Sequence, residues 1–535
     1  MPREKSGSRA DGFSSAGKGY WEGIYGTHKT VYAREVPREK SGSGADGFSS
    51  AGEGYWEGIY GTQNKKGAIT SMGQYQLEGN RFYFKDYDKL PAFSSFLPGV
   101  AGISGIPLWV FYTNRGQGVN SFGIHHKGNA IMEFNPANTA YENTPTKGFR
   151  TFLRRDGEYY EPFCTYSRMA VRTMSVEKNS FSIAEEERGL RVEVSYFVLP
   201  TEEIGALVRR VSIKNISGES CRLEGLDGLP KIIPYGIQNG QFKEMSNLFK
   251  SWTDIKNIDS NAPYYAMRAS SDDSAEVSEI RGGYFCCTAA DGALVPVIYD
   301  AETVFGYDSS LAVPVVFREE GLNGVRGQTQ CFANKVPCGF ASFCRELAPG
   351  EAFAFTSYFG YSGTVGQLNR MAEKFCRDGY AEEKQREAAD IIHALVADAA
   401  TSTADSVFDE YIGQCYLDNF LRGGYPYLFS AGEMAPGKET CSDSAGCGSG
   451  ARKNVVHLYS RKHGDPERDY NFFSIAGEYY SQGNGNFRDV CQNRRSDVFF
   501  HPEIGDFNVW SFFSFIQPDG YNPLEIRPCT FAIPA

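Results

Sequence analysis

The feature that most constrains the fold is a change of hydrophobic period near residue 365. Before that point, short apolar and aromatic runs follow one another, and Gly or Pro residues separate them. After it, apolar residues recur at positions i, i+3, i+4 and i+7, as at Leu368, Met371, Ala372 and Phe375. Short runs bounded by turn residues are typical of strands, and the longer period is typical of helices. The chain is therefore predicted to be a β-rich part followed by a helical part.

Two runs in the β-rich part form the clearest predicted hairpin. Leu190–Leu199 and Ile204–Asn215 are rich in β-branched and apolar residues, and a short polar turn after Pro200 joins them. Arg81–Lys85 and Ala352–Phe359 are further predicted strands. No helical period is recognised between these runs, which indicates an antiparallel sandwich rather than a βαβ sheet.

Helical periods and an aromatic composition mark the second part. Residues 365–405 are predicted to form a helical linker, and residues 406–535 an all-α domain with a Gly-rich loop. The segments assigned in this way are helices over Val365–Cys376, Glu382–Ala399, Phe408–Leu421, Tyr470–Tyr480 and Phe507–Ile516, and the loop Gly437–Gly450.

The first 66 residues contain a near-exact duplication. Residues 1–27 recur as residues 36–62, with differences only at the aligned positions 1/36, 9/44 and 18/53. Two copies are too few for a repeat architecture that buries a shared face. The Gly, Ser and charged composition predicts a partly disordered leader.

Composition excludes several classes of function. The formal net charge is −11 and no dense basic run occurs, which argues against a nucleic-acid partner. No apolar stretch has the length of a membrane span, and the first residues lack the apolar core of a signal peptide, so a cytoplasmic location is predicted. The 13 Cys include no CxxC pair and the seven His show no ligand spacing, so we expect free thiols and no metal site.

Two polar segments could carry chemistry. Arg468–Asp497 mixes Asp, Asn, Gln and Arg side chains with aromatic ones, as sugar recognition requires, and Arg also suits phosphate. An alternative explanation is a helix–loop–helix stabilised by ion pairs and caps. Tyr112–Gly123 is interpreted either as a loop that reaches toward a catalytic part or, with more weight, as a polar hairpin. Phosphate-loop, nucleophile-elbow and dinucleotide-binding signatures are absent.

Several longer strings resemble glycoside hydrolase family 94, and within it the 1,2-β-oligoglucan phosphorylases, often labelled cellobiose phosphorylases. The likeness runs from about Gly67 to Phe531. The strings that carry it are Asn114–Gly123, Ala130–Ala137, Gly148–Phe152, Val208–Asn215, Leu226–Pro230, Asp418–Pro426, Tyr459–Asp465, Arg468–Asn471 and Gly485–Arg495.

The resemblance implies a multidomain β + α protein. Residues 67–364 would form an N-terminal β super-sandwich, residues 365–405 the linker, and residues 406–535 part of an (α/α)6 barrel. It also implies inverting phosphorolysis of β-glucosidic bonds to α-glucose 1-phosphate, with inorganic phosphate as co-substrate and no cofactor. Phosphate is already an anionic nucleophile, so one general acid suffices where an inverting hydrolase needs two carboxylates. A homodimer is the common oligomeric form of the family.

The site residues come from the same resemblance. Arg488 and Asp489 match the family's arginine–aspartate motif at the donor-sugar subsite, and Gln492 and Asn493 occupy the adjacent polar positions. The general acid is expected beyond Ala535, so the chain is expected to be a truncated fragment that is inactive alone and aggregation-prone, because an incomplete barrel leaves apolar faces unburied.

Two other functions stay open. One is a non-catalytic glucan-binding protein. The other is an inverting hydrolase on the same barrel, which needs a pair of carboxylates. The carboxylates available for that pair are Asp465, Glu478, Asp489, Asp497 and Glu503.

Overall fold

The computed structural model describes residues 75–102, 104–167, 169–270, 279–429, 454–458, 461–462, 474–475 and 485–526. The predicted leader over residues 1–66 and the predicted loop Gly437–Gly450 lie outside these ranges. Antiparallel sheets and helices make up the described part, as the sequence predicted for a mixed β and α protein.

An 11-stranded antiparallel sheet is the largest element. Its central hairpin pairs Leu190 with Asn215 at one end and Val198 with Leu207 at the other, so the predicted hairpin is confirmed. The predicted strands Arg81–Lys85 and Ala352–Phe359 also belong to this sheet. In spatial order the strands are β1 (Tyr75–Glu78), β2 (Arg81–Lys85), β9 (Val171–Val176), β10 (Phe181–Glu187), β11 (Leu190–Val198), β12 (Gly205–Asn215), β20 (Ala352–Ser362), β16 (Gly283–Ala290), β15 (Tyr264–Met267) and β14 (Thr253–Lys256), with β17 (Ala293–Leu294) on β16.

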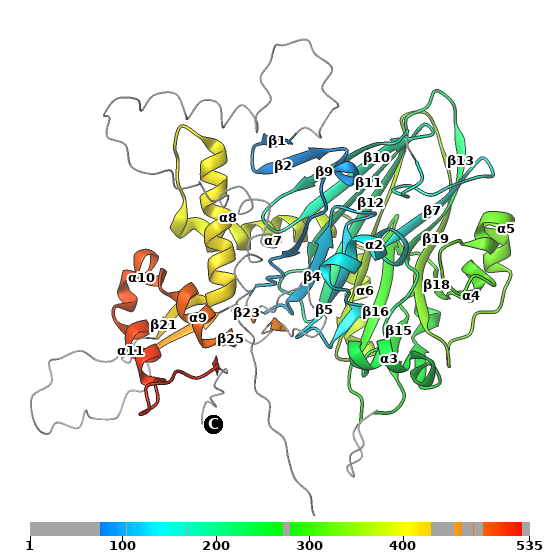
Figure 1. Cartoon of the computed structure of the whole chain (residues 1–535). Coiled ribbons are helices and arrows are strands. Elements are labelled where there is room, and N and C mark those ends of the chain that lie inside the picture. The colour runs from blue at the N-terminus through cyan, green and yellow to red at the C-terminus, as the bar shows by residue number, and fades with distance from the viewer. Residues whose placement is uncertain are drawn as a thin grey trace, which may run out of the picture. The chain divides into compact units, whose positions relative to one another are not determined.

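Two smaller antiparallel sheets accompany it. One has the order β18 (Val297–Asp300), β19 (Pro337–Leu347), β13 (Cys221–Leu229), β7 (Arg150–Arg155) and β8 (Glu158–Tyr160). The other has the order β3 (Ser94–Leu97), β4 (Leu108–Thr113), β5 (Val119–Ile124) and β6 (Ala130–Met132). Figure 1 shows β10, β11 and β12 alongside β13, β7 and β19.

One hydrophobic cluster joins the three sheets. It contains Val194 and Leu207 of the large sheet, Leu223 and Phe343 of the five-stranded sheet, and Phe122 of the four-stranded sheet. Burying a side chain of this size contributes about 1.5–3 kcal/mol, so the shared core holds the sheets together as packed layers.

The expectation that no helix interrupts the strands is wrong. The helices among the strands are α2 (Ala137–Lys147), α3 (Asn239–Lys250), α4 (Glu302–Phe305) and α5 (Val315–Arg326). Local irregularities explain why the spacing of apolar residues did not predict these helices. Pro145 lies inside α2, and non-helical residues interrupt α3 at Met245 and α5 at Gly321. Such breaks shift the phase of an apolar stripe before it has repeated enough to be recognised.

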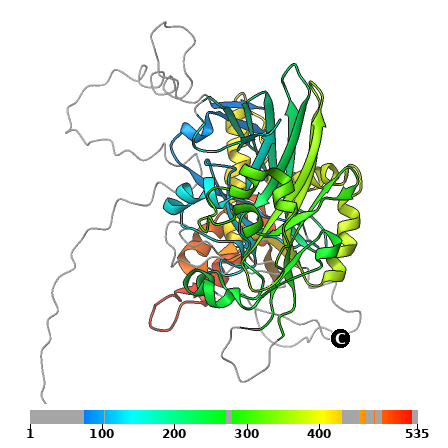
Figure 2. The ribbon, with the colours of Figure 1, turned by 90° about the vertical axis from the view of Figure 1, so that its right-hand side faces the viewer.

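Three predicted helices after residue 365 are confirmed, with boundaries that move by a few residues at most. They are α6 (Val365–Phe375), α7 (Tyr380–Val396) and α8 (Ser406–Gly423). Thr364 caps α6 by accepting a hydrogen bond from the backbone N–H of Gln367. Leu368, Met371 and Phe375 pack on the outer face of the large sheet, where the yellow-green helices lie in the turned view (Figure 2).

The region after α8 is less purely helical than expected. It contains α9 (Phe487–Arg494), α10 (Asp497–Phe500) and α11 (Phe507–Ser514), the last of which confirms the helix predicted over Phe507–Ile516. The helix predicted over Tyr470–Tyr480 is wrong at Ser474–Ile475, which form β24 and pair with β23 (Arg461–Lys462). The other residues of that segment lie outside the described ranges.

Short strands explain the difference. β21 (Tyr425–Phe429) pairs with β22 (Asn454–Leu458), and β25 (Gly485–Asn486) pairs with β26 (Glu525–Ile526). Aromatic and β-branched residues in β21 and β22 favour extended backbone over helix. The (α/α)6 barrel and the boundaries at residues 364 and 405 stay predictions.

Thiols and membrane spans can be assessed only over the described part. The ten cysteines described there are all free, as expected. No described helix has the length and hydropathy that crossing a bilayer requires.

Helices α10 and α11 present several large apolar side chains to solvent. Phe499 is 81% exposed, Phe513 70% and Trp510 50%, whereas Phe512 is buried. A soluble surface rarely carries so many large apolar side chains close together in the sequence. We therefore expect this segment to self-associate through its exposed aromatic side chains. Substituting only those side chains tests association without opening the core around Phe512.

Replacing Trp510 and Phe513 by Ser is expected to reduce self-association several-fold, because the apolar area that drives it is removed. Sedimentation velocity over a concentration series measures the effect. Phe512→Ser is the matched control: it opens the local core, costs about 3–5 kcal/mol of stability, and brings no gain in solubility. Unchanged self-association of the double variant would contradict the assignment of this surface.

Candidate functional site

The four residues predicted to bind the donor sugar lie on α9. Arg488 and Gln492 are exposed and stand one helical turn apart, and Asn493 is half-buried. The side chain of Asp489 lies outside what the structure describes. Residues four apart share one face of a helix, so the structure places Arg488 and Gln492 on a common exposed face.

Helix α9 is anchored on α8 through its C-terminal end. Asn419 of α8 donates from Nδ2 to the backbone oxygen of Asn493 at 3.0 Å. Arg494 donates from Nε to the backbone oxygen of Gly423 at 2.7 Å and is buried. Both contacts satisfy backbone carbonyls near helix ends, where partners within the helix are missing. The exposed face of α9 is therefore carried on a fixed support.

A buried polar cluster lies directly beyond α9. The Nε2 atom of His457 is 3.0 Å from Oδ2 of Asp497, and Nδ2 of Asn508 donates to the same oxygen at 3.0 Å. Asn508 also donates to the backbone oxygen of Arg494 at 3.1 Å. Through these contacts β22, α9, α10 and α11 share one polar core.

Burial dominates the proton affinities in this cluster. It raises the pKa of Asp497 to about 7, although Asn508 and Arg494 act in the opposite direction. It also lowers the pKa of His457 well below 6.5, and the charges of Arg494 and His501 add to that effect. Burial likewise lowers the pKa of Arg494 to about 10. A low-dielectric environment disfavours every charged form, which is the common cause.

A second group of polar contacts lies beside the first. Oη of Tyr416 is 3.1 Å from Nε2 of His501, and Oη of Tyr425 donates to Oδ2 of Asp398 at 3.1 Å. His501 also lies 3.5 Å from the carboxylates of Asp398 and Glu503. These contacts tie α8 to His501, directly after α10, and tie both β21 and His501 to Asp398, directly after α7. They serve to position the elements around α9.

Sequence reasoning missed most of this cluster. His457 and His501 have no motif spacing, and His457 lies 40 positions before its partner Asp497 in the sequence. The sequence singles out Asp497 as one of the carboxylates of the hydrolase alternative, and it places Arg494 and Asp497 in the polar segment Arg468–Asp497. Arg494 and Asp497 hold the local fold, which is the kind of role that the ion-pair explanation assigned to this segment.

The polar segment Tyr112–Gly123 is a hairpin, as the favoured interpretation expected. β4 and β5 pair, and Thr113 donates its N–H to the backbone oxygen of Gly118 at 2.8 Å. Asn114 is buried, and its amide donates to the backbone oxygens of Tyr87 and Pro91. The hairpin's polar groups are thus used inside the β-rich part.

Gln117 connects this hairpin to a buried ion pair. Arg209 Nη2 donates to Gln117 Oε1 at 2.6 Å and to Asp227 Oδ1 at 2.6 Å, and Arg209 Nε donates to Asp227 Oδ2 at 3.0 Å. Thr151 donates to Asp227 Oδ1 at 2.6 Å. Both charged side chains are completely buried. The pair joins β12 of the large sheet to β13 of the five-stranded sheet.

Metal binding receives no support from the described residues, which contain no group of three or more His, Cys, Asp or Glu side chains placed to hold an ion.

Comparison with known proteins does not establish a family. No family model matches the chain, and no curated protein does. Solved structures with some likeness include a polysaccharide lyase, with 10% identity and a TM-score of 0.30 over 50% of this chain and 34% of that one. A bacterial glucoamylase complexed with acarbose has 8% identity and a TM-score of 0.34, over 67% of this chain and 43% of that one.

A protein described as a kojibiose phosphorylase from the human microbiome has 7% identity and a TM-score of 0.23, over 65% of this chain and 33% of that one. The chain thus spans less than half the length of each of these structures. Their TM-scores are too low to argue a shared fold, so they carry no argument about this chain. Membership of family 94 stays a prediction.

Proposed function

We propose that the chain is a carbohydrate-active protein of the glycoside phosphorylase type. In this proposal, α9 holds the glucosyl unit of a β-glucosidic oligosaccharide, with β-1,2-oligoglucan as the substrate class. Inorganic phosphate then attacks C1 of that unit, the glycosidic C1–O bond breaks, and the leaving oxygen takes a proton from a general acid. The products are α-glucose 1-phosphate and a shortened oligosaccharide.

The observation that carries the proposal is the exposed face of α9. Arg488 and Gln492 stand one turn apart on it, while contacts to Asn419 and Gly423 hold the helix from behind. Planar guanidinium and amide groups on a fixed support suit neighbouring sugar hydroxyls, since each can make two hydrogen bonds in one plane. The motif likeness of Arg488 and Asp489 to a donor-sugar subsite points the same way.

The buried carboxylate beyond α9 is assigned no proton transfer. Asp497 has a pKa of about 7, which suits a general acid, but His457 and Asn508 close over it and it is 7% exposed. A general acid must reach the leaving oxygen within hydrogen-bond distance. The enclosure of Asp497 favours the second candidate function, glucan binding without chemistry, over the hydrolase alternative that would use this carboxylate.

Arg488→Ala is expected to weaken binding of β-1,2-linked gluco-oligosaccharides at least tenfold, because a hydrogen bond to a charged group contributes about 1.5–3 kcal/mol. Gln492→Ala is expected to have a smaller effect in the same direction, since its amide is neutral. Isothermal titration calorimetry on the full chain measures both.

Arg495→Ala is the matched control, because Arg495 is exposed on the same segment but is not one of the four residues predicted to bind the donor sugar. Equal affinities for the wild type, Arg488→Ala and Arg495→Ala would contradict the placement of sugar on α9. Phosphate-dependent release of α-glucose 1-phosphate would distinguish the phosphorylase from a binding protein, and turnover without phosphate would favour a hydrolase.

A further inference from the structure

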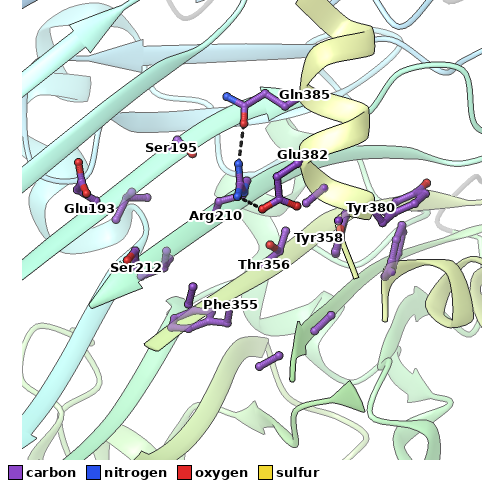
Figure 3. Close-up of a pocket in the computed structure, with 18 of the residues that line it drawn as sticks. Glu193, Ser195, Arg210, Ser212, Phe355, Thr356, Tyr358, Tyr380, Glu382 and Gln385 are labelled. Carbon is purple, nitrogen blue, oxygen red and sulfur yellow. Dashed lines mark hydrogen bonds and ion pairs between the residues drawn. The ribbon is translucent and has the colours of Figure 1, made fainter. Parts of the chain in front are cut away.

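A polar groove lies on the outer face of the large sheet, apart from α9. Its cavity volume is about 780 Å³, within the range of ligand pockets. Figure 3 shows it between the strands and α7, with Ser195, Ser212 and Thr356 on the sheet. We call it the sheet groove and define it by the cross-strand row Ser175, Ser182, Ser195, Arg210 and Thr356.

The strand register places this row on one face. Ser175 pairs with Ser182, Ser182 with Ser195, Ser195 with Arg210, and Arg210 with Thr356, across β9, β10, β11, β12 and β20. Adjacent strands lie about 4.8 Å apart, so four hydroxyls and a guanidinium follow one another at a regular spacing. Ser175 and Ser182 already share a hydrogen bond at 2.6 Å.

Small side chains make the groove hollow. The neighbouring row runs through Ala184, Glu193, Ser212 and Ala354, of which only Glu193 is long. The solvent face of an antiparallel sheet is polar, and long side chains would fill the space above it. Short ones leave it open.

Charged residues form the walls. Arg210 donates to Gln385 of α7 at 2.8 Å and is paired with Glu382 of α7. At the opposite end, Arg81 donates to Glu177 at 2.6 Å. Figure 3 shows Gln385 and Glu382 reaching from α7 toward Arg210. The contacts of Arg210 hold α7 against the sheet along one side of the groove.

An unsatisfied hydroxyl lies at the α6 end of the groove. Tyr358 lines the groove from the same face of β20 as Thr356, and its ring stacks on Phe375 with centroids 3.7 Å apart. Its side chain is 1% exposed, and its Oη has no hydrogen-bond partner among the described residues. Leaving a buried hydroxyl unpaired costs about 1–3 kcal/mol, so this atom points to a missing polar partner.

The charge of the lining narrows the class of ligand. Three arginines face five carboxylates, which leaves an excess of two negative charges and disfavours phosphate-rich or acidic polymers. A peptide cannot bind here by adding a strand to the sheet, because the backbone groups of β10, β11, β12 and β20 already pair with one another. Hydroxyls both donate and accept hydrogen bonds, as do those of a neutral sugar.

We propose that the sheet groove binds a neutral oligosaccharide at a site separate from α9. No α9 residue lines the groove, so the proposal stands independently of the function proposed for α9. The ligand's hydroxyls would pair with the serine row and Arg210, and one of them with Tyr358 as the end of the groove opens.

The test uses the full chain carrying Arg488→Ala and Gln492→Ala, which removes the proposed α9 contacts. Binding of β-1,2-linked gluco-oligosaccharides to this background is measured by calorimetry, with oligogalacturonate as an acidic comparator. Measurable binding of the neutral sugar and none of the acidic one is expected. Adding Ser195→Tyr and Ser212→Tyr fills the groove and is expected to weaken binding at least tenfold.

Lys214→Tyr is the matched control, since Lys214 is exposed on the same face of β12 but outside the groove. Tyr358→Phe removes the unpaired buried hydroxyl, so it is expected to leave the free protein at least as stable as the wild type and to weaken binding about fivefold. Absence of neutral-sugar binding in the Arg488→Ala, Gln492→Ala background would overturn the groove proposal whatever happens at α9. Equal binding by the filled and control variants, or preference for oligogalacturonate, would also overturn it.

Discussion

Asp227→Ala is expected to lower the free energy of unfolding of the β-rich part by about 3–5 kcal/mol. The substitution leaves the guanidinium of Arg209 buried without its carboxylate, and both side chains are completely enclosed. Burial lowers the pKa of Arg209, but the charge of Asp227 and the contact with Tyr196 raise it above its usual value, so the guanidinium is charged in the fold. Urea unfolding followed by circular dichroism measures the loss.

Two comparisons make this prediction specific. Glu383→Ala breaks the exposed pair with Arg377 and is expected to cost less than about 1 kcal/mol. Arg209→Met combined with Asp227→Leu removes both charges and is expected to recover much of the loss, because no unpaired charge remains buried. A cost for Asp227→Ala as small as that of Glu383→Ala would show that the pair is not enclosed as described.

Asp497→Asn is expected to gain stability relative to the wild type as the pH rises. Burial raises the pKa of Asp497 from 3.8 to about 7, so the folded chain binds this proton more tightly than the unfolded chain does. The stability that Asp497 contributes is therefore present below pH 3.8 and is lost as the pH rises through about 7. Asparagine cannot ionise, so the variant avoids the loss, which is about 2–3 kcal/mol between roughly pH 5 and 8.

The difference between variant and wild type isolates this effect. His457 acts with the opposite sign, since its lowered pKa makes stability fall as the pH drops below 6.5, but His457 is present in both proteins. Arg494 and Asn508 also face Asp497 and are unchanged. Asp519→Asn, at an exposed position, is the control. A pH-independent difference for Asp497→Asn would mean that the carboxylate is ionised throughout this range.

The sequence predicted those elements whose own residues carry a strong pattern. β11 and β12 were recognised because two long β-rich runs flank a short polar turn. α6 was recognised because Leu368, Met371 and Phe375 repeat at helical spacing and all lie buried. In contrast, α2 contains a proline and α5 contains a kink, so their apolar residues do not repeat at a regular helical spacing.

The sequence predicted only those residues of the candidate site that lie within one contiguous motif. Arg488 and Gln492 lie on one short helix, so sequence likeness could select them together. The cluster around Asp497 and the sheet groove draw on residues from separate elements, and the groove depends on a register that aligns Ser182, Ser195 and Arg210. A shift by one residue would turn these side chains to the other face.

Arg209 and Arg210 show most directly which features the sequence predicts and which depend on the tertiary structure. The sequence by itself determined that these two arginines lie in a strand, because β-branched and apolar residues surround them, and that alternation sends them to opposite faces. Only the tertiary structure decided that Arg209 is enclosed against Asp227 and that Arg210 faces Glu382, because each of these partners lies on another element of the fold. Burial of a charge is favourable only where a partner is already in place, and that partner comes from a distant segment of the chain.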